Sequence, residues 1–178
     1  IATPMPTPRG VTLLLDSGAN VDSKPRHLVQ SALMGSIYSQ YIFDMEKPRV
    51  GLLNIGEEET KGNEQALATY PLLQQMTTIN FIGNVEGRDI PKGNVDVVIC
   101  DGFVGNVVLK FAEGLAKTLM KLIKETIKDG GLLANVKNLL VGSMLFLDAE
   151  LICAPITYPH RIGPWRVTSA HGEVSKRV

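Results

Sequence analysis

Residues 95–119 read VDVVICDGFVGNVVLKFAEGLAKTL, and this stretch decides the fold class. Residues 95–100 form a short apolar run rich in β-branched side chains, which is typical of a buried strand. A polar turn with two glycines follows at residues 101–106. Apolar side chains then recur every three or four residues, as on one face of an amphipathic helix. This stripe consists of Leu109, Ala112, Ala116, Leu119, Ile123 and Ile127.

The same order of apolar run and polar loop occurs three more times along the chain. The runs and their loops are residues 11–15 and 16–20, residues 50–55 and 54–64, and residues 79–82 and 83–87. Strands that alternate with helices predict an α/β fold with a mostly parallel sheet. In such sheets ligands bind beside the carboxyl ends of the strands. The four polar loops therefore mark the expected binding edge.

Two further helices are expected between the strands. The first begins near Asp22 or Ser23, carries Pro25 in its first turn and ends before Lys47-Pro48. The second covers residues 62–75. The inward side chains of the first helix are predicted to be Leu28, Ala32, Ile37 and Tyr41.

Composition limits the function classes. The chain has 178 residues, 44% hydrophobic and 20% charged, so one globular domain is the default expectation. Its 18 basic and 18 acidic side chains give a formal net charge of zero, which argues against nucleic-acid binding. The most apolar stretch, residues 138–147, is too short for a membrane-spanning helix. The chain begins at Ile1 without a signal-peptide pattern, so a cytoplasmic protein, or a fragment of one, is expected.

The two cysteines do not indicate a metal site. Cys100 and Cys153 form no Cys-x-x-Cys pair, and two thiols alone cannot hold zinc. Cys100 ends an apolar run and is expected to be a buried, unreactive thiol. Free thiols fit a reducing cytoplasm.

The turn at residues 101–106, DGFVGN, is the first candidate binding loop. Its glycines allow close approach of the backbone, and free N–H groups at the start of the following helix would attract an anion. Asn106 adds an amide donor. The alternative is a tight turn with an asparagine cap. The chain carries neither GxGxxG nor GxxxxGK[ST], so dinucleotide and P-loop sites have no support.

Residues 54–64, NIGEEETKGNE, form the second candidate loop. Lys61 is a cation flanked by Thr60, Gly62 and Asn63, all of which can approach an oxyanion. The glutamates at 57–59 could bind a metal, hold Lys61, or start the next helix, whose N-terminus favours acidic side chains. Helix capping and solvation explain most of these glutamates, so no metal is expected.

Three other segments carry weaker signals. Residues 1–8 are rich in proline and threonine and form either a rigid binding segment or a terminal linker. His171 is a single histidine, which is more often structural than catalytic. Residues 132–152 are either a pair of core helices or an amphipathic hairpin that rests on a lipid surface.

Five segments resemble the bacterial PlsX-type phosphate acyltransferase family. They read IATPMPT, LLLDSGAN, RVGLLNIGEEETKGNE, NFIGNVEGRDIP and VDVVICDGFVGNVVLKFAEGLAK, and the resemblance covers residues 1–128 almost continuously. It implies a three-layer Rossmann-like fold of the isopropylmalate dehydrogenase and phosphotransacetylase type. It also implies transfer of a fatty acyl group from acyl carrier protein to inorganic phosphate, giving acyl phosphate for phospholipid synthesis in bacteria.

The resemblance also implies a site and partners. The expected partners are acyl carrier protein, phosphate and a second copy of the chain, with peripheral membrane contact through residues 132–152. No bound cofactor is expected, because phosphopantetheine arrives on the carrier protein. Lys61, Asn106 and His171 are assigned as catalytic. The substrate-binding or phosphate-binding assignments are Thr3, Thr7, Asn20, Thr60, Gly62, Asn63, Gly102 and Gly105.

The chain departs from the family pattern at both ends. The family carries a Met-Gly-Gly-Asp segment in an amino-terminal half that this sequence lacks. It also has Tyr-Gly-Gly-Ala-Pro-Leu-Leu-Gly before Ala-His-Gly, where this chain reads LICAPITYPHRIGPWRVTS. We therefore divide the chain into an α/β core, residues 1–130, and a hairpin with an atypical tail, residues 131–178. The alternatives are a metal-dependent dehydrogenase of the same fold group, and an inactive fragment that binds only carrier protein or membrane.

Overall fold

The structure is a computed structural model that describes residues 1–128. Five strands form one sheet in the order β1-β2-β5-β3-β4. β2, β5, β3 and β4 are parallel, and β1 is antiparallel at the edge. The strands are β1 (Ala2–Thr7), β2 (Gly10–Leu15), β3 (Arg49–Leu53), β4 (Asn80–Val85) and β5 (Val97–Ile99). The predicted mostly parallel α/β sheet is confirmed.

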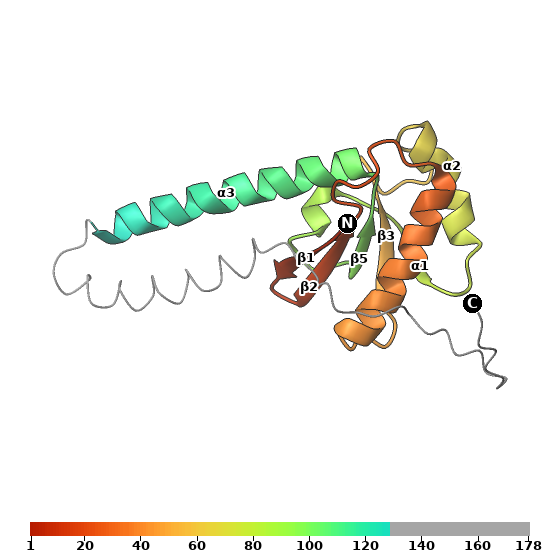
Figure 1. Ribbon diagram of the computed structural model, residues 1–178, viewed down its shortest axis with the longest axis horizontal. Helices are drawn as coiled ribbons and strands as arrows, with labels where there is room; N and C mark the ends of the chain where they lie inside the picture. The colour runs from red at the N-terminus through yellow and green to blue at the C-terminus, as the bar shows by residue number, and fades with distance from the viewer. Residues whose placement is uncertain (129–178) are drawn as a thin grey trace, which may run out of the picture.

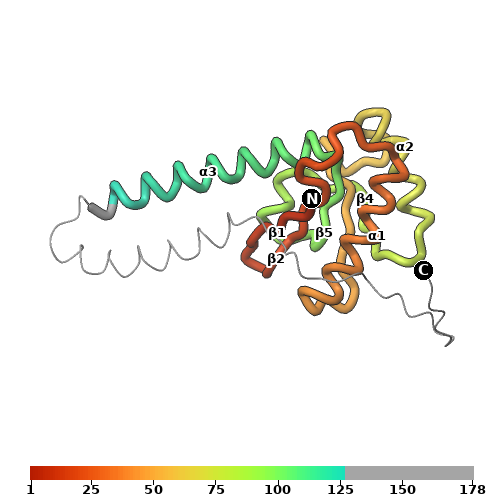
Figure 2. The backbone as a smooth tube through the Cα atoms, viewed as in Figure 1, coloured from red at the N-terminus to blue at the C-terminus, as the bar shows by residue number. Residues whose placement is uncertain are grey.

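Among the described residues, α1 (Pro25–Ile42) and α2 (Glu64–Gln74) connect successive strands, a short 3-10 turn, η1 (Gly87–Asp89), lies between β4 and β5, and α3 (Gly102–Lys128) follows β5. α1 and α2 pack against each other and against one face of the sheet. α3 starts directly after β5 and extends far beyond the sheet (Figure 1). The backbone tube shows the same extension (Figure 2).

Residues 2–7 form a strand, not a linker. β1 pairs with β2 along its whole length, from Ala2 opposite Leu15 to Thr7 opposite Gly10. The prolines favour a rigid segment or a linker at the sequence level. An edge strand tolerates proline, because one side of it needs no ladder hydrogen bonds.

β4 continues through residues that were predicted to be a loop. Val50 pairs with Phe81, whereas Leu52 pairs with Asn84, so β4 carries one extra residue between these pairs. Gly83 lies in this interval with a φ of 97°. A bulge at a glycine lets the strand resume its pairing instead of ending there.

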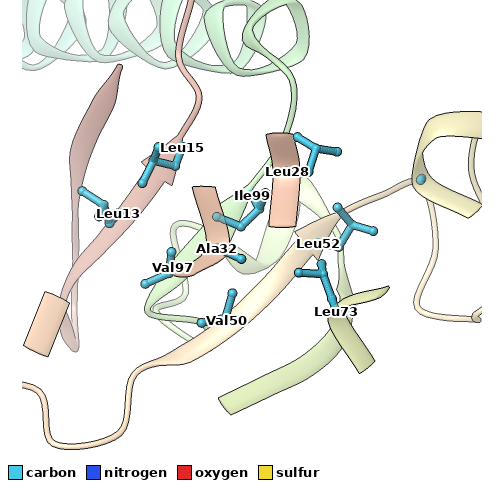
Figure 3. Packing of buried hydrophobic residues seen from close by; sticks show 10 residues of the cluster. Leu13, Leu15, Leu28, Ala32, Val50, Leu52, Leu73, Val97 and Ile99 are labelled. Carbon is cyan, nitrogen blue, oxygen red and sulfur yellow. The ribbon is translucent and has the colours of Figure 1, made fainter. Parts of the chain in front are cut away.

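The sheet separates two cores. Leucine and valine side chains from β2, β3 and β5 meet Leu28 and Ala32 of α1 and Leu73 of α2 (Figure 3). On the other face, Leu14, Val98 and Cys100 pack with Val95. Burying such side chains contributes about 1.5–3 kcal/mol each. This burial fixes the strand order, and the strand order brings the carboxyl-end loops together.

The inward face of α1 differs from the prediction at two positions. Leu28 and Ala32 are buried, but Ile37 and Tyr41 are 45% and 83% exposed. Small residues face inward instead, because a side chain added at Gly35 would lie 2.6 Å from Val97. α1 thus approaches the sheet too closely for large side chains. It begins at Pro25 after Lys24, not after Asp22 or Ser23.

The amino ends of the central strands are held by an ion pair. Arg49 Nη2 lies 2.7 Å from Asp96 Oδ1, and Arg49 Nε donates to Oδ2 at 2.9 Å. The same guanidinium donates to the Gly93 carbonyl. Burial would raise the pKa of Asp96, but the hydrogen bonds from Arg49 outweigh burial and lower it. This two-pronged pair ties β3 to the segment that enters β5.

Most of α3 exposes apolar side chains. Among the residues the structure describes, no helix is long and apolar enough to cross a membrane. On α3, Phe103, Val107, Phe111, Leu115 and Leu122 are each about half exposed or more. The stripe predicted from residue spacing is on a helix, as expected. Its members Leu119 and Ile123 are 49% and 42% exposed.

Candidate active site

The loop after β2 is organised by Asp16. This carboxylate is 4% exposed and accepts hydrogen bonds from the backbone N–H groups of Gly18, Ala19 and Asn20 at 2.8–3.0 Å. The amino group of Ile1 donates to it as well. Burial alone would raise the pKa of Asp16, but these donors outweigh burial and lower it to about 2. Asp16 is therefore an ionised anchor that sets the shape of the loop.

This loop lies against the start of α3. The Gly102 N–H donates to the Asn20 carbonyl at 2.8 Å. A side chain at Gly105 would lie 1.9 Å from the Asp16 carbonyl oxygen, so only glycine fits there. Asn106 faces the same loop, since a Cβ atom added at Gly18 would lie 3.6 Å from Asn106 Oδ1. The structure thus brings together Asn20, Gly102, Gly105 and Asn106.

The start of α3 is not a row of free donors, which corrects the sequence-based expectation for this turn. Gly102 donates to Asn20, and the Val104 N–H donates to Asp101 Oδ1 at 2.8 Å. Asp101 is therefore the cap, and its negative charge opposes an anion at this position. Asn106 remains exposed as a side-chain donor.

The loop after β3 is closed by Asn54. Its Nδ2 donates to the Lys61 carbonyl at 2.9 Å, and its Oδ1 accepts from the Ile55 N–H at 2.8 Å. Gly62 has a φ of 107°, and a side chain there would lie 2.5 Å from Asn54 Oδ1. Asn63 caps α2 by accepting from the Ala66 N–H. Asn54 thus fixes the position of Lys61 relative to the start of α2.

The side chains of Glu57 and Glu59 have partners other than Lys61. Glu57 lies 3.9 Å from Arg88, and Glu59 accepts a hydrogen bond from the Tyr70 hydroxyl at 3.1 Å. The cap of α2 is Asn63, not a glutamate. The expectation that residues 57–59 cap the helix is therefore wrong, whereas Glu58 does hold the Lys61 backbone, because its carbonyl accepts from the Lys61 N–H at 3.1 Å. The Lys61 side chain is exposed, with its stem against Gly56.

A cleft of about 450 Å³ opens between the ends of β3 and β5 and the starts of α1, α2 and α3. Its polar lining residues include Asn54, Asn63, Gln65 and Asp101. Gly62, beside Lys61, belongs to the wall, and so does Val104, two residues before Asn106. Neither Lys61 nor Asn106 belongs to the wall itself. The aliphatic lining residues are Leu28, Leu52, Leu53, Ile55, Ala66 and Val104.

Cys100 also lines this cleft and is unreactive, as predicted. It is 4% exposed, and its thiol lies 3.5 Å from the Asp16 carbonyl oxygen. Burial, followed by the charges of Asp101 and Asp16, raises the pKa of Cys100 to about 12. A thiol with this pKa stays protonated at neutral pH and is a poor nucleophile.

The remaining predicted site residues have different positions. Thr3 lies beside the Asp16 loop, where its hydroxyl is 2.6 Å from that of Ser17. Thr7 pairs with Gly10 at the opposite edge of the sheet, so the structure does not bring it to the site. Thr60 is exposed next to Lys61. His171 and the predicted hairpin at residues 132–152 lie outside the described residues.

Sequence reasoning missed Asp16, Asn54 and the aliphatic wall of the cleft. Asp16 opens the loop that contains the predicted residue Asn20. Its role depends on hydrogen bonds from backbone N–H groups, which residue spacing does not reveal. Asn54 directly follows a strand at the binding edge, and that position was a usable signal. Among residues 1–128, no group of three or more histidine, cysteine or acidic side chains is arranged to hold a metal.

Comparisons with known proteins identify relatives of this chain. Residues 1–148 match the family described as fatty acid synthesis protein. The phosphate acyltransferase of Desulfitobacterium hafniense is 65% identical over 128 residues, or 71% of this chain and 38% of the relative. That of Elusimicrobium minutum is 51% identical over 163 residues, or 92% of this chain and 46% of the relative.

A solved structure supports the fold. The phosphotransacetylase EutD from Staphylococcus aureus superposes with a TM-score of 0.52 at 16% identity, covering 65% of this chain and 42% of the other. This likeness shows a Rossmann-like fold of the phosphotransacetylase type. The chain spans less than half the length of the curated relatives it matches. Because the family match covers most of the sequence, the chain belongs to the family of fatty acid synthesis proteins that includes these phosphate acyltransferases.

Proposed function

We propose that this chain carries part or all of a site that transfers a fatty acyl group from acyl carrier protein to inorganic phosphate. The observation that carries the proposal is the high identity to relatives named phosphate acyltransferase, 51–65% over 128 residues or more. The geometry supports it, because Lys61 is an exposed cation directly next to Gly62, which lines a cleft of ligand size.

The chemistry requires little from a general base. Phosphate carries much of its second negative charge near neutral pH, since the second pKa of phosphate monoesters is about 6. A phosphate oxygen attacks the thioester carbonyl, the C–S bond breaks, and the electron pair leaves on sulfur, which takes a proton from water. The products are acyl phosphate and the free carrier thiol. The protein has to position two anionic reactants and stabilise the oxyanion.

Two groups are suited to these tasks. Lys61 supplies a positive charge at the start of α2, where the helix dipole also favours an anion. Asn106 supplies an uncharged donor at the loop after β2. Gly62 and Asn63 allow phosphate to approach the backbone beside Lys61. His171, outside the described residues, remains a third proposed catalytic group.

The partners are part of the same proposal. Acyl carrier protein delivers phosphopantetheine, so no bound cofactor is required. The exposed apolar side chains of α3, among them Phe103 and Phe111, support a homodimer. Peripheral attachment to a bacterial cytoplasmic membrane through residues 132–152 completes the proposal.

The test incubates the chain with palmitoyl-acyl carrier protein and phosphate. Acyl phosphate is trapped with hydroxylamine, and the free thiol is measured in parallel. We expect both products to form with phosphate and neither with sulfate. The full-length Desulfitobacterium hafniense relative serves as positive control. Carrier-protein binding without thiol release would instead identify the chain as a docking piece, and release without phosphate would identify a thioesterase.

A further inference from the structure

The cleft is apolar despite the polar residues in its wall, because those side chains already have partners inside the protein. Asn54 bonds to the backbone of Ile55 and Lys61. Asn63 accepts from Ala66, and Gln65 donates to the Ser23 carbonyl. Asp101 caps α3. The cavity therefore meets mainly aliphatic carbon.

The charges of the wall disfavour phosphate in the interior of the cleft, away from Lys61. Among residues 1–128, the cleft wall contains no lysine or arginine, and its one carboxylate is that of Asp101. Cys100 is held protonated by burial, so it supplies no charge and no nucleophile. An anion in this cavity would lose its hydration and gain no cation. An alkyl chain would lose no hydrogen bonds there and would gain burial of its surface.

We propose that this cleft binds the acyl chain of the thioester substrate, and that Ala66 and Val104 limit the chain length it accepts. The identity of the ligand as an acyl thioester rests on the proposed function. Ala66 is the smallest side chain of the aliphatic wall and is 8% exposed. The room for the acyl chain therefore depends on the size of the side chain at this position. Val104 lines the same cleft from the first turn of α3.

The position of the cleft suits the reaction. Gly62 lines the cleft and is bonded directly to Lys61. An acyl chain seated in the cleft can therefore leave its carbonyl near the loop that carries Lys61. Acyl binding and phosphate binding become neighbouring but separate subsites.

The experiment measures binding without turnover. Butanoyl-, octanoyl- and dodecanoyl-pantetheine are titrated into the chain without phosphate, and methyl NMR shifts are followed. We expect Leu28, Leu53 and Val104 to shift, and affinity to rise about fourfold for each methylene that enters the cleft. The key variant is Ala66→Leu. Its matched control is Ala68→Leu, the same change at an exposed position of α2 outside the cleft.

We expect Ala66→Leu to weaken octanoyl-pantetheine binding by about tenfold, the equivalent of one to two buried methylenes, and to spare butanoyl-pantetheine. Ala68→Leu should bind all three ligands as the parent does. If Ala66→Leu does not fold, Val104→Phe replaces it with the same expectation. Affinity independent of chain length in the parent, or equal losses in both alanine variants, would overturn the assignment.

The result separates this inference from the proposed function. Length-dependent binding without acyl phosphate formation would retain the cleft and reject the reaction. Acyl phosphate formation with the same chain-length preference in the parent and Ala66→Leu would retain the reaction and reject the cleft.

Discussion

The two edges of the sheet are built differently. At the amino edge, Arg49 and Asp96 lock β3 to β5, and the Thr12 hydroxyl donates to the Val95 carbonyl. At the carboxyl edge, the side chains of Asp16, Asn54 and Asp101 also hold the loops, but Lys61 and Asn106 stay exposed. The amino edge uses its polar side chains for cohesion, whereas the carboxyl edge combines such side chains with two exposed ones that are available to a ligand. Stability and ligand binding should therefore respond to different substitutions.

The largest effect is expected from the exposed donors of the carboxyl edge. Lys61→Ala or Asn106→Ala should lower kcat for acyl phosphate formation about 100- to 1000-fold, the usual loss for one oxyanion-stabilising donor. Steady-state kinetics with acyl carrier protein thioester would measure it. The matched control is Lys92→Ala, which removes a cation paired with Asp89 away from the site. A rate within threefold of the parent for the Lys61 variant would contradict its assignment.

Next in size is a stability effect at the same edge. Gly105→Ala places a methyl group 1.9 Å from the Asp16 carbonyl oxygen, so the loop or α3 must move. We expect a loss of about 3 kcal/mol in the free energy of unfolding. Urea denaturation measures it. Gly114→Ala is the control on the same helix, since its added methyl meets nothing within 4 Å, and should stabilise by about 0.5–1 kcal/mol. Equal effects of the two variants would show that α3 does not dock as described.

The free energy of unfolding is expected to depend on pH through the carboxylate of Asp16, the residue whose backbone carbonyl lies against Gly105. Its folded pKa of about 2 lies below the ordinary value of 3.8. The carboxylate therefore contributes stability that is fully present above pH 4 and is lost as pH falls towards 2. The contribution is about 2 kcal/mol. Across this range the denaturation midpoint should change less with pH in Asp16→Asn than in the parent. An unchanged pH dependence in the variant would assign it to other groups.

The smallest effect should come from the amino edge. Arg49→Met removes the hydrogen bonds to Asp96 and Gly93 but keeps the aliphatic stem. Because the guanidinium is partly exposed, we expect a loss of only about 1 kcal/mol in the free energy of unfolding. Affinity for octanoyl-pantetheine should not change. A loss of ligand affinity larger than the loss of stability would mean that the two edges are coupled.

The parts of the fold that follow from local patterns could be predicted from sequence. Four β-branched runs gave the parallel strands, and residue spacing gave α3. The inward face of α1 could not be predicted, because Gly35 brings the helix so close to Val97 that small residues replace Ile37 and Tyr41. β1 was missed because proline disfavours strands except at an edge, and edge position is a property of the whole sheet.

The site was predictable to the level of loops but not of contacts. Strand ends identified the loops that contain Asn20, Lys61 and Asn106. The partners of the glutamates and the occupied donors at the start of α3 depend on segments far apart in sequence, such as Glu57 with Arg88. The aliphatic cleft is assembled from five elements, so no single motif signals it.

The prolines of β1 determine how this chain can associate with others. Pro4 and Pro6 lie on β1, an edge strand of the described sheet, where they pair with Leu13 and Val11 of β2. Neither proline has an N–H to offer to an incoming strand. The sheet is therefore blunted against strand addition from a neighbouring molecule on this side. Contacts that form there must use side chains, which makes them reversible and selective instead of open-ended.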